Sequence, residues 1–147
     1  MNNKNKELIN QMNNLIVDYH ILYIKCHYYH WIIRGISFIS LHQLFEDAYK
    51  QTLEMIDNVA ERISMLDGEI HFTLQDIWNQ KKIPDAQNFQ DYNDIIADMV
   101  STYGQIIALE TSVMETVKKY NDEVSLDILI ENQRINHKTF WIIKKHI

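Results

Sequence analysis

The sequence predicts an all-α fold, a four-helix bundle in which a long connection joins the second and third helices. The chain has one proline and three glycines among 147 residues, so few residues interrupt helices or form the turns of a sheet. Apolar residues recur at three- and four-residue spacing along four long segments, which is the period of an amphipathic helix. The length and the 46% hydrophobic composition predict a single domain over residues 1–147.

The first helix is predicted over residues 5–33, and Gly35 ends it. Its apolar stripe consists of Leu8, Met12, Leu15, Ile16, Tyr19, Leu22, Tyr23, Cys26 and Ile33. The single cysteine, Cys26, lies in this stripe and is predicted to be a packed core thiol. One cysteine cannot form an internal disulfide, which indicates a reducing compartment.

The second helix is predicted over residues 38–66, with Ser37 or Ser40 as its N-cap. Ser40 and Gln43 have the spacing of a capping box. One apolar stripe consists of Leu41, Leu44, Ala48, Thr52, Met55, Val59 and Ile63. A second stripe, about 100° away around the helix, consists of Phe45, Tyr49, Leu53, Ile56 and Ala60. We therefore expect one side to face its own bundle and the other to face a partner chain.

A long crossover follows the second helix, which Asp67 and Gly68 end. The crossover carries a short helix predicted over residues 74–80. The third and fourth helices are predicted over 89–119 and 124–145. A connection of this length can run along the whole bundle, so the third helix need not be antiparallel to the second.

The charge balance narrows the class of partner. The net charge is −6, from 20 acidic and 14 basic residues, so nucleic acid is not an expected partner, whereas an acidic surface suits cations. The start of the chain lacks an apolar signal segment, and no stretch of 18 apolar residues occurs. We expect a cytoplasmic protein with no membrane contact.

Histidine and carboxylate side chains on the first two helices predict a metal site, because this ligand set suits iron, zinc or manganese. His30 lies near the end of the first helix and His42 near the start of the second, so the hairpin should bring them together. Asp57 and Glu61 lie one turn apart on one face. Simpler readings are hydrogen-bonded histidines near helix ends, an exposed acidic pair, or an ion pair of Glu61 with Arg62.

Helix geometry separates the two halves of this ligand set. His42 and Asp57 are fifteen residues apart on one helix, which is about 22 Å. They cannot share a metal within one chain. Antiparallel packing of the second helix on its copy would place the histidines of one chain over the carboxylates of the other, giving two equivalent sites per dimer. A metal site inside one bundle typically uses Glu-x-x-His pairs, and the sequence has none.

These residues resemble the signature of the Dps family, the starvation-induced DNA-protection mini-ferritins of the ferritin-like superfamily. The strong similarity covers residues 27–62, and weaker agreement in the helix pattern extends over nearly the whole chain. The matching residues are His27-x-x-His30-Trp31-x-x-x-Gly35-x-x-Phe38-x-x-x-His42 and Asp57-x-x-Ala60-Glu61-Arg62.

The resemblance implies a ferritin-like bundle and an intersubunit ferroxidase centre that can take two ferrous ions. His30 and His42 would come from one subunit, and Asp57 and Glu61 from its two-fold mate. Glu46 stands where many members have an aspartate that helps to hold the second iron, and the longer side chain leaves occupancy of that position open.

Trp31 matches an aromatic residue that supplies or relays electrons in the family, with interface packing as an equal alternative. His27 is expected to be structural. Glu123 and Asp127 match the acids of a pore through which iron enters, although acids at a helix start also favour the helix dipole. Lys118 stands where some members have a further acid of the pore.

The resemblance further implies a homododecamer built from two-fold dimers. Such a cage oxidises ferrous iron, preferably with hydrogen peroxide, and stores the ferric mineral, which protects against oxidative damage. The family's DNA-binding members use basic tails. This chain offers only Lys4 and Lys6 at one end and Lys144 and Lys145 at the other, so DNA binding is not expected. The alternatives are a DNA-compacting or other interaction protein of the same fold with little ferroxidase activity, and a manganese or zinc binder.

Overall fold

The computed structural model describes the backbone of residues 3–147 and the side chains from residue 5 onward. Residues 1 and 2 of the predicted domain, and the side chain of Lys4, lie outside the described part. The helices are α1 (Asn3–Ile32), α2 (Phe38–Met65), α3 (Leu74–Gln80), α4 (Tyr92–Lys119) and α5 (Glu123–Lys144). None of the described helices is long and apolar enough to cross a membrane.

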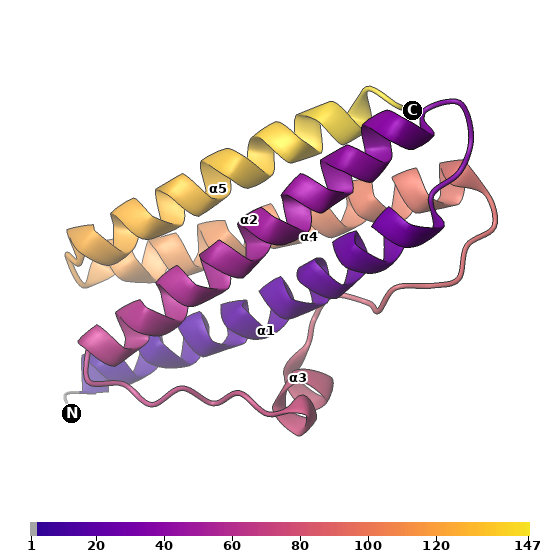
Figure 1. Cartoon of the computed structure of the whole chain (residues 1–147). Helices are drawn as coiled ribbons and strands as arrows, with labels where there is room; N and C mark the ends of the chain where they lie inside the picture. Colours follow the sequence, from indigo (N-terminus) through magenta and orange to yellow (C-terminus); the bar gives the residue numbers. More distant parts are fainter. Residues whose placement is uncertain (1–2) are drawn as a thin grey trace.

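The four long helices form a closed bundle (Figure 1). Helix α1 packs beside α2 and α4, and α5 packs beside α4 and α2. The crossover after α2 carries α3 and runs back along α1, so α4 begins at the end of the bundle where α2 also begins. The predicted all-α bundle with a long crossover and a short extra helix is confirmed.

The apolar stripe of α1 forms one wall of the core. Most of its side chains are buried, and Tyr23 is half-buried against the core. Cys26 is fully buried, with its Sγ 3.6 Å from the hydroxyl of Tyr103, and burial raises the pKa of this thiol to about 12. The prediction of a packed core thiol is therefore confirmed.

Helix α2 ends through a residue in the left-handed conformation. Asp67 has φ 56°, which lets the backbone N–H of Gly68 donate to the carbonyl of Ile63 at 2.9 Å. Asn121 has φ 55° and ends α4 in the same way. After glycine, Asp and Asn adopt the left-handed conformation at the lowest cost. Each therefore allows its helix to end and the chain to turn at that position.

The predicted capping box of Ser40 and Gln43 is wrong. Helix α2 begins at Phe38 with Ser37 as N-cap, and no side-chain hydrogen bond caps it. Ser40 lies inside the first turn, where its hydroxyl donates to the carbonyl of Ser37 at 3.0 Å, and Gln43 instead donates to Asp47.

Helix α4 begins at Tyr92, three residues later than the predicted start at 89. Asp91 is its N-cap and accepts a hydrogen bond from the backbone N–H of Asn93 at 2.6 Å. The apolar spacing in the sequence begins before this cap, at Phe89, because Phe89 packs against the core from the crossover. The helix was therefore predicted to begin too early.

The second stripe of α2 is divided between the core and the surface. Phe45 and Ile56 are buried within their own chain, whereas Tyr49 and Ala60 are half-buried and Leu53 is 42% exposed. Only part of this stripe is therefore available to a partner.

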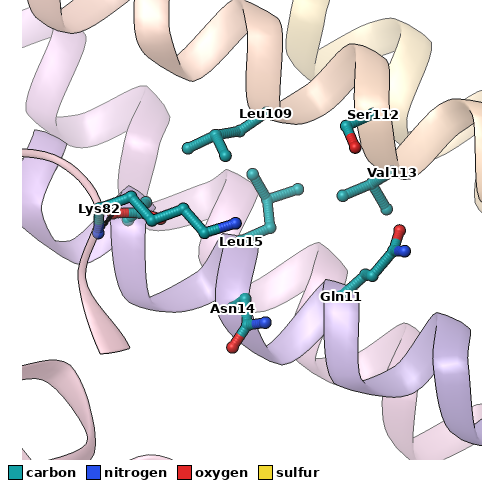
Figure 2. A pocket seen from close by; sticks show the side chains of 8 residues that line it. Gln11, Asn14, Leu15, Lys82, Leu109, Ser112 and Val113 are labelled. Atoms are coloured by element: carbon teal, nitrogen blue, oxygen red, sulfur yellow. Dashed lines mark hydrogen bonds between the residues drawn. The ribbon is translucent and has the colours of Figure 1, made fainter. Parts of the chain in front are cut away.

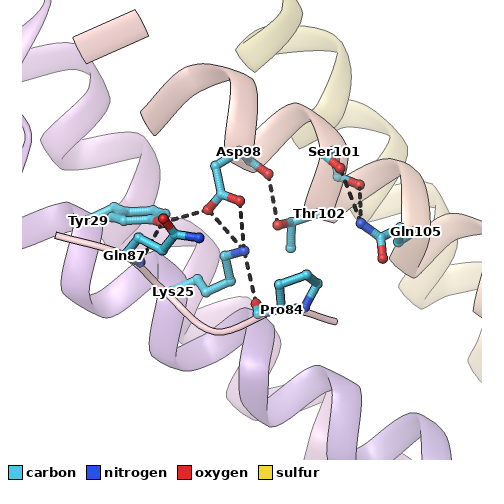
Figure 3. Close-up of polar contacts among 8 residues, drawn as sticks. All are labelled: Lys25, Tyr29, Pro84, Gln87, Asp98, Ser101, Thr102 and Gln105. Carbon is cyan, nitrogen blue, oxygen red and sulfur yellow. Dashed lines mark hydrogen bonds and ion pairs between the residues drawn. The ribbon is translucent and has the colours of Figure 1, made fainter. Parts of the chain in front are cut away.

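Buried polar side chains of α1 attach the crossover to the bundle. Lys25 is fully buried, and its ammonium donates to the carbonyl of Pro84 at 3.1 Å and to the carboxylate of Asp98 in α4 at 2.9 Å (Figure 3). Tyr29 donates to the same carboxylate at 2.5 Å and accepts from the backbone N–H of Gln87. Separating one partner of such a pair would leave a buried charge unpaired, which is costly. Because Lys25 and Tyr29 also bind the backbone of the crossover, this cluster fixes the path of the crossover.

Two further α1 residues hold the first part of the crossover and its middle. The side chain of Asn13 donates to the carbonyl of Glu69 and accepts from the N–H of His71, both at 2.9 Å. Asp18 accepts two backbone hydrogen bonds from the segment that follows α3. The crossover is therefore positioned by hydrogen bonds to its backbone, together with the buried side chains of Ile77 and Ile83.

A carboxyl group lies in the middle of the bundle. Glu110 of α4 is fully buried, and its Oε1 accepts from the hydroxyl of Tyr19 at 2.7 Å and from the amide of Asn136 at 2.6 Å. Asn132 donates in turn to the Tyr19 oxygen. Burial raises the pKa of Glu110 to about 7, because the two hydrogen bonds compensate only part of the desolvation cost.

We expect the stability of the fold to fall as the pH rises through neutrality. Glu110 binds its proton more tightly in the fold, with a pKa of about 7, than at the ordinary 4.5 of an unfolded chain. Its contribution is therefore present in full below pH 4.5 and is lost as the pH rises through 7, by up to about 3 kcal/mol. The free energy of unfolding in urea, measured from pH 5 to pH 8, checks this.

Glu110→Gln should remove that pH dependence. Glu115→Gln, which changes an exposed glutamate of the same helix, is the control and should keep it. An unchanged slope in Glu110→Gln would show that another group titrates.

Candidate metal centre

His30 and His42 meet where α1 ends and α2 begins. The Nδ1 atom of His30 is 2.7 Å from the backbone carbonyl of His42, and Nδ1 of His42 is 2.7 Å from that of His30. The rings stack at 3.7 Å between centroids and 16° between planes. Because a carbonyl oxygen can only accept, each Nδ1 carries the hydrogen in these bonds, and each Nε2 keeps its lone pair for a metal.

Glu46 adds a carboxylate to this pair. It lies one turn after His42 on α2, and one ligand atom from each of His30, His42 and Glu46 lies within 4.8 Å of the others. Glu46 also forms an ion pair with Lys50, whose hydrogen bond and charge lower the pKa of the carboxyl. The hairpin thus assembles two imidazoles and one carboxylate in one chain.

Asp57 and Glu61 form a separate group further along α2. Both are exposed and lie one turn apart, fifteen and nineteen residues beyond His42, so the helix keeps them about 22 Å and about 28 Å from that histidine. Neither forms a hydrogen bond or an ion pair with any residue in the described part of the chain. Arg62 does not pair with Glu61, because its guanidinium binds Asp122 at 2.9 Å.

The sequence profile of the ferritin-like domain family matches residues 9–147 of this chain. The chain is 26% identical over 140 residues to DNA protection during starvation protein 2 of Bacillus anthracis, covering 95% of this chain and 96% of that protein. The crystal structure of Dps from Staphylococcus aureus superimposes with a TM-score of 0.90 at 25% identity, covering 96% of this chain and 95% of that one.

The chain belongs to the Dps proteins of the ferritin-like family.

A Dps protein from Vibrio cholerae, described as one of the ferritin-like diiron-carboxylate proteins, has the same fold as this Dps chain. The TM-score is 0.90 at 24% identity, covering 97% of this chain and 89% of that one.

Aromatic rings surround the histidine end of this Dps chain. Trp31 is 62% exposed and packs on His27 at 4.1 Å between centroids. His27 also packs on Tyr49, which meets the edge of His30 at 5.6 Å. Tyr23 lies within hydrogen-bond distance of His27, which gives that histidine a structural contact. Trp31 is therefore linked to His30, a candidate ligand, through the rings of His27 and Tyr49, and its exposed face suits either electron relay or interface packing.

The acids at the start of α5 lie on a different side of the molecule. Glu123 is the first residue of the helix and is exposed, and Lys118, its neighbour across the turn, forms an exposed ion pair on its own helix. Asp127 lines a hollow of about 270 Å³ between α2 and α5 together with Glu61 and Glu131. The sequence did not predict that Asp127 lies close to Glu61, or that Glu131 lines the same hollow. Both features depend on how α2 and α5 pack.

We expect removal of Lys50 to make Glu46 a better ligand. Lys50→Met frees the carboxylate from its ion pair and should tighten cobalt binding at the histidine end by up to about fivefold, since an exposed ion pair contributes at most about 1 kcal/mol. Anaerobic titration calorimetry with Co²⁺ measures this. Lys6→Met, an equal change of charge at the exposed start of α1, is the control, and equal tightening in both variants would mean that only net charge matters.

Proposed function

We propose that the protein is a ferroxidase that oxidises ferrous iron at a site shared by two subunits and stores the ferric product in a cage. The carrying observation is that one chain presents two incomplete ligand groups. His30, His42 and Glu46 form one, and Asp57 with Glu61 forms the other, too far away on the same helix to complete it.

A two-fold axis supplies the missing half of each group. Antiparallel packing of α2 on a second α2 brings the histidines of one chain to the carboxylates of the other, and the symmetry makes two equivalent sites. The exposed Leu53 and the half-buried Tyr49 and Ala60 provide apolar surface for that contact. Metal binding would then stabilise the dimer, because its ligands come from both chains.

Iron is the substrate that the ligand chemistry and the relatives favour together. Two imidazole nitrogens with carboxylates suit ferrous iron but also zinc and manganese, so the donor set alone does not choose. The Vibrio cholerae relative is described as a diiron-carboxylate protein, which favours iron. Glu46 is the residue that would help to hold a second ferrous ion.

The reaction we propose uses hydrogen peroxide as the preferred oxidant. Two ferrous ions each give one electron to one peroxide molecule, whose O–O bond breaks, and two protons complete two waters. Both reagents of hydroxyl-radical formation are removed in this step. Trp31 would relay an electron when only one iron is bound, with packing at the interface as its alternative role, and its contact with His27 supports the first role.

We infer that the two-fold dimers assemble into a dodecamer in the cytoplasm. Glu123 and Asp127 would line the pore through which iron enters this dodecamer. The adjoining hollow that Asp127 shares with Glu61 would lead ions from the pore towards the site. Protection against oxidative damage follows from iron and peroxide removal, without DNA as a partner, since the net charge is −6.

Mixed assemblies of two inactive variants test the shared site. His30→Ala/His42→Ala lacks one half, and Asp57→Ala/Glu61→Ala lacks the other, so each assembly alone should oxidise ferrous iron only at the background rate. Co-expressed in equal amounts, they should recover about one quarter of wild-type activity, because half of the dimers then hold one complete site of two. Stopped-flow absorbance with peroxide measures the rate.

A mixture of wild-type and His30→Ala/His42→Ala chains is the control for assembly and should give about half of the activity per chain. Mixtures of the two inactive variants that stay at background would contradict a site shared between chains. Wild-type assemblies without peroxide-dependent iron oxidation would instead favour an interaction protein of the same fold.

A further inference from the structure

A polar cavity on the opposite side of α1 from α2 lies outside the proposed ferroxidase site. It lies between α1 and α4, the crossover closes it at Lys82, and its volume is about 110 Å³ (Figure 2). The polar groups that line it from the helices are Gln11, Asn14 and Asp18 of α1 and Ser112 of α4. Apolar side chains complete the lining, and the polar ones offer carboxylate, hydroxyl and amide oxygens as well as amide N–H groups, with no imidazole and no thiol.

Asp18 is the acidic group of this cavity. Its side chain is 1% exposed, and its Oδ1 accepts the backbone N–H groups of Lys82 at 2.8 Å and Ile83 at 3.0 Å. The other oxygen, Oδ2, is buried and has no hydrogen-bond partner within the described residues. Burial raises the pKa of this carboxyl, and the two backbone hydrogen bonds and the charges of Lys82 and Lys81 offset only part of that effect.

A second acceptor of the same cavity is also unsatisfied. The Oε1 atom of Gln11 is buried and has no hydrogen-bond partner in the described part of the chain. Buried oxygens without donors are costly, so a ligand that offers positive charge and hydrogen-bond donors would stabilise the fold here.

Lys82 is the only side chain that brings positive charge into the cavity lining. Its side chain reaches across the cavity towards Leu15 in Figure 2, but its ammonium forms no ion pair with Asp18 within 4.0 Å. The flexible, exposed lysine is therefore a competitor for a cation and leaves the buried carboxylate without a fixed partner.

The size and the ligand type suit a hydrated ion. A water occupies roughly 30 Å³ in the liquid, so about 110 Å³ has room for about three or four waters, or for an ion with part of its water shell. Magnesium is bound through one or two carboxylates and keeps several waters, and it prefers oxygen to nitrogen or sulfur.

We propose that this cavity binds a hydrated divalent cation of the magnesium class, with Oδ2 of Asp18 as its direct protein ligand. The waters of the ion donate to the side-chain oxygens of Gln11, Asn14 and Ser112. The bound ion joins α1, α4 and the crossover, because these three elements line the cavity. This site is independent of the proposed ferroxidase centre, which contains none of these residues.

Titration calorimetry of the iron-free assembly with MgCl₂ tests the proposal, alongside thermal unfolding in MgCl₂ and in NaCl of equal ionic strength. The wild type should bind one ion per chain and should unfold at a higher temperature in MgCl₂. Lys82→Met removes the competing ammonium and should tighten binding about threefold or more. Asp18→Asn, which keeps an oxygen for the backbone N–H groups, should weaken binding at least about tenfold.

Three further variants complete the design. Lys138→Met changes the net charge as Lys82→Met does, at a remote exposed position, and should leave the affinity unchanged. His30→Ala/His42→Ala should also bind magnesium normally, which separates this site from the ferroxidase proposal. If Asp18→Asn does not fold, Gln11→Leu carries the test and should weaken binding a few-fold. No saturable binding in the wild type, or equal affinity in wild type and Asp18→Asn or Gln11→Leu, would overturn the proposal.

Discussion

The continuity of α2 is the constraint on which the functional organisation depends. The helix carries His42 and Glu46 near its start and Asp57 and Glu61 in its second half, and no break lies between them. A helix of this kind keeps Asp57 about 22 Å from His42 and about 17 Å from Glu46 along its axis in every conformation of one folded chain. One chain therefore cannot bring its two ligand groups to the same metal. The proposed chemistry requires two chains, so it is coupled to assembly.

A second organising feature is the set of buried polar residues on α1. Asn13, Asp18, Lys25 and Tyr29 lie on the helix that also carries His30, and each is bonded to the backbone of the crossover or to a residue that is. These contacts hold the crossover along the bundle. Buried polar contacts also hold the core around Glu110. There a buried carboxyl joins three helices through hydrogen bonds in addition to packing.

The sequence predicted the helices and the hairpin well because both follow from local patterns. Apolar spacing located the four long helices, and the positions of His30 and His42 near the helix ends predicted their meeting. Other features depend on tertiary packing, which leaves no periodic trace. The carbonyls that orient the two imidazoles belong to the backbone, and the partners of Lys25 and Glu110 are more than 20 residues away in the chain. The start of α4 was misplaced because Phe89 packs like a helical residue before Asp91 caps the helix.

Anomalous diffraction from crystals grown or soaked with ferrous iron or cobalt under anaerobic conditions would show whether the metal lies between two chains. We expect a strong peak bonded to Nε2 of His30 or His42 of one protomer and to the carboxylates of Asp57 and Glu61 of its two-fold mate. Metal bound by residues of one protomer alone, or no metal between these groups, would contradict this expectation.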